Sequence, residues 1–190
     1  LSTKVTYFSM GKDTSISQES YDRMTMYIGA SGWGEFIIGE EPEIIKLQPD
    51  ELLIVPAGTL CGMQTSNGIV YTEIICTGKD INMNANVKTN EVFALKNLIS
   101  YEEGSIANMD VVSTPDMKYV LMAFDEGTGL TPHRAPGNAI VFALEGKATI
   151  GYEGKDYELS EGECFRFEKN GLHSVTANGK FKMALLLVLE

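Results

Sequence analysis

The feature that most constrains the fold is a succession of short apolar runs, rich in β-branched and aromatic residues, that alternate with glycine-containing turns. Most of these runs are as long as one β-strand, and long helical patterns do not intervene between them. Many short strands separated by turns are typical of β-sandwiches and β-barrels. The sequence therefore predicts an all-β fold. The runs that carry this prediction are residues 51–57, 69–76, 119–124, 139–144, 164–167 and 183–189.

One stretch, residues 91–100, has a helical pattern instead. Apolar side chains recur in it at helical spacing, and Asn90 stands where it can cap the first turn. We predict that this stretch forms a short helix or a helical turn where the chain passes between two halves.

The two halves are visible because the sequence repeats a pattern of strand, glycine turn, strand, acidic turn and strand. When the two copies are aligned, Gly32 coincides with Gly146. A repeat at this period indicates two domains of similar build, for which we predict the limits 1–88 and 89–190. The aligned stretches are residues 25–39 with 139–153 and residues 46–61 with 158–173.

The charge balance and the length of the apolar runs bear on which partners the protein can bind. The chain contains 15 Lys and Arg against 26 Asp and Glu, a formal net charge of −11, which repels phosphate backbones. The longest apolar run, residues 183–189, is far shorter than the ~20 residues needed to cross a bilayer. We therefore expect neither a nucleic-acid partner nor a membrane partner.

The cysteines indicate the compartment. Cys61, Cys76 and Cys164 are widely spaced and odd in number, which argues against a disulfide framework and favours a reducing cytoplasm. The first residues lack the basic segment and apolar run of a secretory signal. Cys61 has no neighbouring base that would activate its thiol, so we interpret it as a packing residue.

The second half contains two stretches that resemble the characteristic motifs of the cupin superfamily. Residues 129–146 read GLTPHRAPGNAIVFALEG, against a first motif of the form G…HxHxxxE…G. Residues 154–173 read GKDYELSEGECFRFEKNGLH, against a second motif of the form G…PxG…H. The only two histidines of the chain, His133 and His173, both fall on motif positions. The resemblance is to small bacterial cupin domain proteins. It implies two tandem double-stranded β-helix (jelly-roll) barrels with a short connecting helix.

The resemblance also implies a metal site, because a typical cupin holds its metal ion with three histidines and one glutamate. Here Ala135 replaces the second histidine and Ala139 replaces the glutamate. We predict that His133 and His173 hold at most a loosely bound divalent metal, since a catalytic zinc site usually has three protein ligands. The candidates for a third donor, which the spacing does not identify, are Glu126, Tyr152 and Cys164.

The first half departs further from the family pattern. Cys61 aligns with His173, and no histidine precedes Tyr27. The resemblance therefore implies a degenerate N-terminal barrel without a recognisable metal site.

These substitutions predict a binding or sensing protein for a small organic molecule. Replacing a histidine and a glutamate by alanines makes the lumen of the C-terminal barrel larger, less charged and more apolar, as ligand pockets are. If position 139 faces the lumen, strand alternation places position 141 there too. The predicted ligand-binding residues are His133, Ala135, Ala139, Val141 and His173.

Two other functions stay open from the sequence. A metal-dependent enzyme, resembling cupin dioxygenases or isomerases, would use a metal held by His133, His173 and a third donor as a Lewis acid. A structural oligomerisation scaffold would need no site at all. For assembly we expect a homodimer, or a monomer whose two barrels mimic one.

Overall fold

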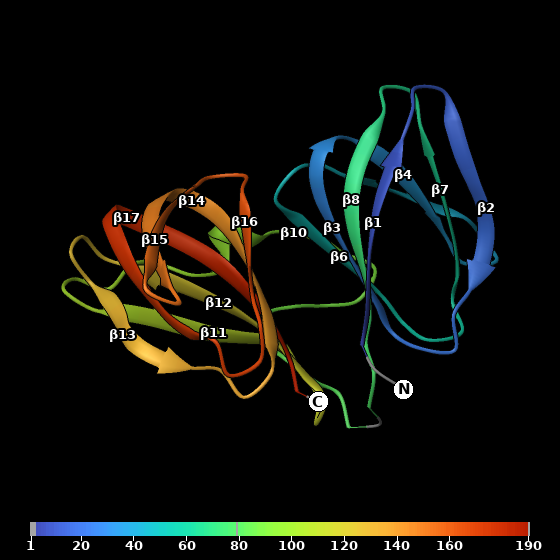
Figure 1. Ribbon diagram of the computed structural model, residues 1–190. Helices are drawn as coiled ribbons and strands as arrows, with labels where there is room; N and C mark the ends of the chain where they lie inside the picture. The colour runs from blue at the N-terminus through green and yellow to red at the C-terminus, as the bar shows by residue number, and fades with distance from the viewer. Residues whose placement is uncertain (1–2, 79, 190) are drawn as a thin grey trace. The chain divides into compact units, whose positions relative to one another are not determined.

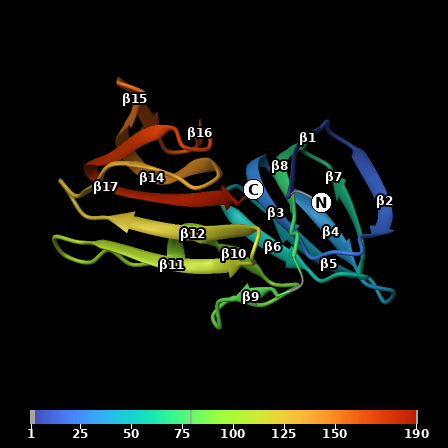
Figure 2. The ribbon, with the colours of Figure 1, turned by 60° about the horizontal axis from the view of Figure 1, so that its bottom comes forward.

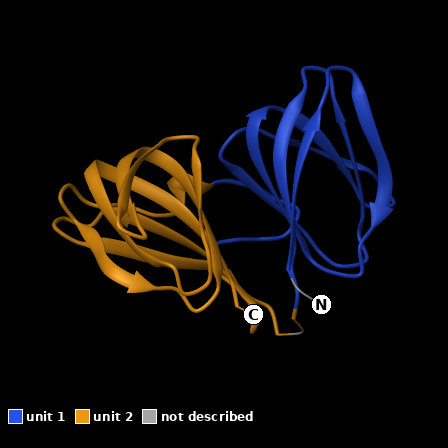
Figure 3. Ribbon diagram, viewed as in Figure 1, with its two compact units in different colours: residues 1–77, 85–94 blue, residues 78–84, 95–190 orange. Residues whose placement is uncertain are grey.

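The computed structural model describes residues 3–78 and 80–189, and these residues form β-strands, turns and a single 3-10 turn (Figure 1). The chain divides into two compact units (Figure 3). Unit 1 comprises residues 1–77 and 85–94, and unit 2 comprises residues 78–84 and 95–190. No helix in the described parts of the chain has the length and apolarity that crossing a bilayer requires.

Unit 1 consists of two antiparallel sheets, with strand orders β1-β8-β3-β6-β10 and β2-β7-β4-β5. In β4 buried and half-buried residues alternate, as expected of a strand with one face on a core. The apolar core lies between the two sheets and includes Tyr27, Phe36, Leu53 and Tyr71. The strands are β1 (Lys4–Met10), β2 (Thr14–Ser20), β3 (Thr25–Gly32), β4 (Gly34–Ile38), β5 (Glu43–Leu47), β6 (Glu51–Val55), β7 (Leu60–Thr65), β8 (Ile69–Ile75) and β10 (Val92–Ala94).

Unit 2 is organised around two long strands, β14 and β17, which pair with each other along most of their length. The main path of the sheet runs β15-β14-β17-β12-β11-β9, with β13 added to β17 and β16 added to β14. Figure 2 shows β17, β12 and β11 side by side, as the pairing registers require. The elements are β9 (Asn82–Met83), η1 (Leu95–Asn97), β11 (Ile106–Ser113), β12 (Met117–Phe124), β13 (Gly129–Arg134), β14 (Asn138–Tyr152), β15 (Lys155–Ser160), β16 (Cys164–Phe167) and β17 (Leu172–Val188).

The two glycines that the sequence alignment superposes have the same structural role in the two units. Gly32 has φ +66°, and a Cβ there would lie 2.1 Å from the carbonyl oxygen of Gly68. Gly146 has φ +76°, and a Cβ there would lie 2.1 Å from the carbonyl oxygen of Lys180. Each glycine therefore allows a bend and a close approach to a neighbouring backbone carbonyl, neither of which a residue with a Cβ would permit.

The connecting segment differs from its prediction. Residues 91–100, expected to form a short helix or a helical turn, contain the strand β10 followed by the 3-10 turn η1. Val92 pairs with Leu53 on β6, so the segment extends a sheet edge in unit 1 before it turns. Tertiary pairing outweighs the weak helical spacing here, since nine or ten residues make only a marginal helix by themselves.

Candidate functional site

The two predicted histidines meet across one ladder. β13 pairs with β17 so that His133 lies directly opposite His173. Their ring centroids are 4.2 Å apart, and the His173 ring also stacks on Phe167 at 4.2 Å. The geometry of unit 2 therefore brings the two histidine side chains together.

Backbone carbonyls set the tautomer of both rings. Nδ1 of His133 lies 2.8 Å from the carbonyl oxygen of Thr131, and Nδ1 of His173 lies 2.9 Å from that of Gly171. A carbonyl oxygen only accepts hydrogen bonds, so each Nδ1 donates and carries the proton. In the neutral rings each Nε2 then presents a lone pair.

His173 stays neutral near physiological pH. Burial lowers the pKa of His173, the hydrogen bond to Gly171 raises it, and the charge of His133 lowers it further. His173 is 7% exposed, whereas His133 is exposed to solvent. The pair thus combines one buried acceptor nitrogen with one that water can reach.

The donors present do not make up a protein-ligated metal centre of the three-ligand type. Among the described residues, no three His, Cys, Asp or Glu side chains gather closely enough to hold a metal ion. Of the candidate third donors, Glu126 and Cys164 are exposed, and the Tyr152 hydroxyl accepts a hydrogen bond from the Glu168 backbone amide at 3.3 Å. Two imidazoles alone would leave most of the coordination shell to solvent.

The other predicted ligand-binding residues lie in the core of unit 2. Ala139 and Val141 are buried and belong to a cluster with Phe167 and Val175, so strand alternation places them on one inward face as expected. Ala135 is buried as well, and its carbonyl oxygen accepts a hydrogen bond from Asn170. Aromatic and aliphatic side chains fill the interior beside them.

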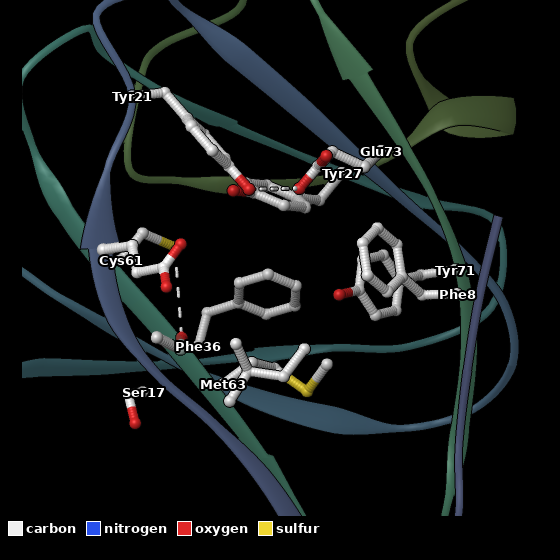
Figure 4. Close-up of a pocket in the computed structure, with 12 residues that line it drawn as sticks. Phe8, Ser17, Tyr21, Tyr27, Phe36, Cys61, Met63, Tyr71 and Glu73 are labelled. Atoms are coloured by element: carbon white, nitrogen blue, oxygen red, sulfur yellow. Dashed lines mark hydrogen bonds between the residues drawn. The ribbon is translucent and has the colours of Figure 1, made fainter. Parts of the chain in front are cut away.

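Unit 1 contains a cavity that sequence reasoning missed. Its volume is about 170 Å³, and side chains from both sheets line it (Figure 4). The edge strands β1 and β2 both contribute, so the cavity reaches the open edge between the sheets. The lining residues are Phe8, Ile16, Ser17, Glu19, Tyr21, Tyr27, Phe36, Cys61, Gly62, Met63, Tyr71 and Glu73.

Aromatic rings form much of the cavity wall. The rings of Tyr27 and Phe36 are 4.8 Å apart at 52°, and Phe36 meets Tyr71 edge-on at 5.9 Å. Phe8 stacks on Tyr71 at 4.9 Å. Tyr27, Phe36 and Tyr71 are therefore inclined to one another, whereas Phe8 lies parallel to Tyr71 and covers one of its faces (Figure 4).

One carboxylate lies inside this aromatic wall. Glu73 is 4% exposed, and its Oε2 accepts a hydrogen bond of 3.4 Å from the Tyr21 hydroxyl. Burial raises the pKa of Glu73, while the hydrogen bond from Tyr21 and the charge of Lys4 lower it. The net upward shift means that the folded protein holds the ionised carboxylate at a cost.

The buried phenols and the thiol of the cavity are protonated near neutral pH. Burial raises the pKa of Tyr27 and Tyr71, and it raises the pKa of Cys61 to about 11 although a hydrogen bond with Tyr27 acts against it. Cys61 is therefore a thiol with little nucleophilic character, in agreement with its interpretation as a packing residue.

The alignment of the two units explains why the polar cavity lies in unit 1. Cys61 pairs with Glu19 where His173 pairs with His133. Tyr27 pairs with Glu73 in unit 1, whereas the aligned Val141 pairs with Leu185, an apolar partner. A phenol and a carboxylate thus occupy places that unit 2 fills with aliphatic side chains.

A sequence signal for this cavity existed. Glu73 interrupts the apolar run 69–76, and Tyr71 stands two residues before it, on the same face of a strand. A charged residue inside a buried strand needs a partner or a function.

Comparison with known proteins shows which of them are similar to this chain. Residues 120–189 match the family model described as a cupin domain. The structure is similar to that of a cupin 2 conserved barrel domain protein from Leptotrichia buccalis, with TM-score 0.86 and 26% identity over 98% of this chain and 84% of that one.

Two further structures share the fold at lower identity. A salicylate 1,2-dioxygenase mutant from Pseudoaminobacter salicylatoxidans has TM-score 0.74 and 10% identity over 98% of this chain and 70% of that one. A cupin superfamily protein from Desulfitobacterium hafniense has TM-score 0.53 and 19% identity over 55% of this chain and 96% of that one. No curated protein matches the sequence.

Proposed function

We propose that this chain, whose residues 120–189 match the cupin domain model and whose fold is similar to that of a cupin barrel protein, binds a small organic molecule in the cavity of unit 1. The observation that carries the proposal is this cavity of about 170 Å³ between the two sheets, with Glu73 buried in its wall. Ligand sites are mostly apolar and concave, with a few polar groups that orient the ligand. The cavity meets this description, which supports a binding or sensing role.

The energetics of Glu73 favour a function over a structural role. Burial shifts its pKa upward despite the Tyr21 hydrogen bond, so the carboxylate is held in an unfavourable environment in the absence of a further partner. Acids whose pKa is shifted by burial in a concave site are typical of functional sites. A ligand that pairs with the carboxylate would offset the cost of its burial.

For unit 2 we propose a second, weaker site at His133 and His173. The two Nε2 lone pairs support it, since they suit a hydrogen-bond donor of a ligand or a loosely held divalent metal completed by solvent. Ala135, Ala139 and Val141 would form the apolar floor of this site. If a metal-dependent reaction occurs in this protein, these two histidines are its candidate ligands.

We also propose that the protein works as a homodimer in a reducing compartment such as the cytoplasm. The free thiols of Cys61, Cys76 and Cys164 support the compartment. Dimers are the commonest closed assemblies of soluble chains.

The test is a thermal-shift screen of neutral, cationic and anionic small molecules against three proteins. These are the wild type, Cys61→Phe, which fills the cavity, and the matched control His133→Asn in unit 2. We expect compounds that raise the Tm of the wild type and of His133→Asn but not of Cys61→Phe. If no compound stabilises the wild type, or if His133→Asn rather than Cys61→Phe removes the effect, the proposed site in unit 1 is wrong.

A further inference from the structure

The charged groups of the unit 1 cavity all have one sign. Glu73 lies within its wall and Glu19 lines it from β2, while none of the described lining residues is Lys, Arg or His. An anionic ligand would meet like charges in this cavity, which is costly. The net charge of −11 on the whole chain adds a field of the same sign.

The aromatic side chains of the cavity wall favour a cationic ligand. A cation is attracted to the face of a Tyr, Trp or Phe ring within about 6 Å of its centroid, and more strongly when water is excluded. Phe36 and Tyr71 stand nearly perpendicular at 77°, and Tyr27 is inclined to Phe36 by 52°. Rings of different orientation thus line one cavity, and a cationic group held there would contact aromatic side chains.

The volume of the unit 1 cavity limits the size of the ligand. An apolar cavity of about 150 Å³ holds one benzene molecule. The unit 1 cavity, at about 170 Å³, suits a molecule of that size or slightly larger.

Building on the proposed function, we infer that the ligand of unit 1 is a small organic cation, an amine or quaternary ammonium with a short apolar body. Glu73 supplies the counter-charge, and the aromatic side chains of Tyr27, Phe36 and Tyr71 contact the cationic group from the cavity wall. The Tyr21 hydroxyl holds the carboxylate in place through its hydrogen bond.

The experiment compares cationic probes with uncharged molecules of the same shape. Choline is titrated calorimetrically against the full chain beside its carbon isostere, in which a tert-butyl group replaces the trimethylammonium group. Benzylamine is paired with benzyl alcohol in the same way. We expect each cation to bind at least about tenfold more tightly than its neutral partner.

Two variants separate the contributions of charge and ring. Glu73→Gln keeps the size of the side chain and its hydrogen-bond acceptor. It should weaken the binding of the cations at least about tenfold and leave the binding of the neutral isosteres nearly unchanged. Phe36→Leu removes an aromatic ring without introducing a polar group. It should weaken the binding of choline more than the binding of its isostere. Glu43→Gln, on the exposed part of β5, is the matched control and should change neither.

The outcomes distinguish this inference from the proposed function. If the neutral isosteres bind as tightly as the cations, or if Glu73→Gln leaves the cations unaffected, the cation inference is wrong although the cavity binds ligands. The inference is also wrong if neither cation binds at millimolar concentration while neutral compounds in the screen do. If nothing binds in either experiment, the proposed function fails as well.

Discussion

Glu73 stands directly opposite Tyr27 in the antiparallel ladder between β8 and β3, and both side chains line the cavity of unit 1. Directly opposed residues of such a ladder project from the same face of the sheet. A carboxylate and a phenol thus share one wall inside a barrel whose counterpart in unit 2 is aliphatic.

Replacing Glu73 by Gln should stabilise the protein at neutral pH. Because the folded-state pKa is raised above its ordinary value of 4.5, the folded state prefers the protonated carboxyl. The stability that the protonated Glu73 carboxyl contributes is complete below the ordinary pKa and is lost as the pH rises through the folded-state pKa. Glu73→Gln avoids this loss, so its free energy of unfolding at pH 7 should exceed that of the wild type by on the order of 1 kcal/mol.

Urea unfolding of both proteins between about pH 4 and pH 8 measures this difference. The advantage of the variant should shrink as the pH falls. Tyr21, Tyr27, Tyr71 and Cys61 all have raised pKa values and do not titrate in this range. A variant that is less stable than the wild type at pH 7 would indicate a structural role for the carboxylate.

The His173 imidazole should titrate below its ordinary pKa of 6.5. Burial disfavours the charged ring, so this histidine contributes stability that is present above the ordinary pKa and is lost as the pH falls through the folded-state value. Proton NMR resolves the titration, because the chain has only two histidines and His133→Asn assigns the remaining signal. A His173 signal that titrates at or above 6.5 would contradict the buried position of the ring.

Restoring the two missing family ligands should create a metal site in unit 2. Ala135→His together with Ala139→Glu would add two donors beside His133 and His173, and we expect divalent-metal affinity at least about tenfold above that of the wild type. Ala139→Glu alone should destabilise the protein by roughly 2–4 kcal/mol, because position 139 lies in the apolar core.

Calorimetric titration with Zn²⁺, with elemental analysis of protein purified without an affinity tag, measures both effects. A folded double variant that binds no metal would refute the motif alignment. A wild type that already carries one tightly held metal per chain would refute the degenerate-site interpretation and favour an enzyme.

Gly146→Ala should destabilise unit 2 far more than Gly154→Ala. Both glycines have positive φ, +76° and +79°, which costs an alanine about 1–2 kcal/mol. Only at Gly146 would the new methyl group also meet the carbonyl oxygen of Lys180, at 2.1 Å. We expect a loss of roughly 3 kcal/mol or more for Gly146→Ala in thermal unfolding, and equal losses would mean that the close strand approach at this bend is absent.

Much of the fold could be predicted from the sequence because its determinants are local. Alternating apolar runs predict the strands, and the positive φ of Gly32 and Gly146 explains why glycine recurs at aligned places. The motif positions of His133 and His173 likewise predict their meeting across one ladder. The helical spacing of residues 91–100 misleads, since the pairing of Val92 with Leu53 depends on a strand far away in the sequence.

The cavity could not be predicted in the same way. It depends on how tightly side chains from two sheets fill the space between them, which no single run reveals. Ala139 and Val141 were expected to open a pocket in unit 2, yet neighbouring side chains such as Phe167 occupy the space beside them. In unit 1 a space of about 170 Å³ remains, with Tyr27, Tyr71 and Glu73 in its lining, an outcome of three-dimensional packing.

A crystal structure of the full chain grown with saturating choline tests the central claim most directly. We predict choline in the cavity of unit 1, with its ammonium group against the aromatic wall of Tyr27, Phe36 and Tyr71 and next to the Glu73 carboxylate. A structure with no choline in this cavity, or with choline bound instead at His133 and His173, would contradict the account.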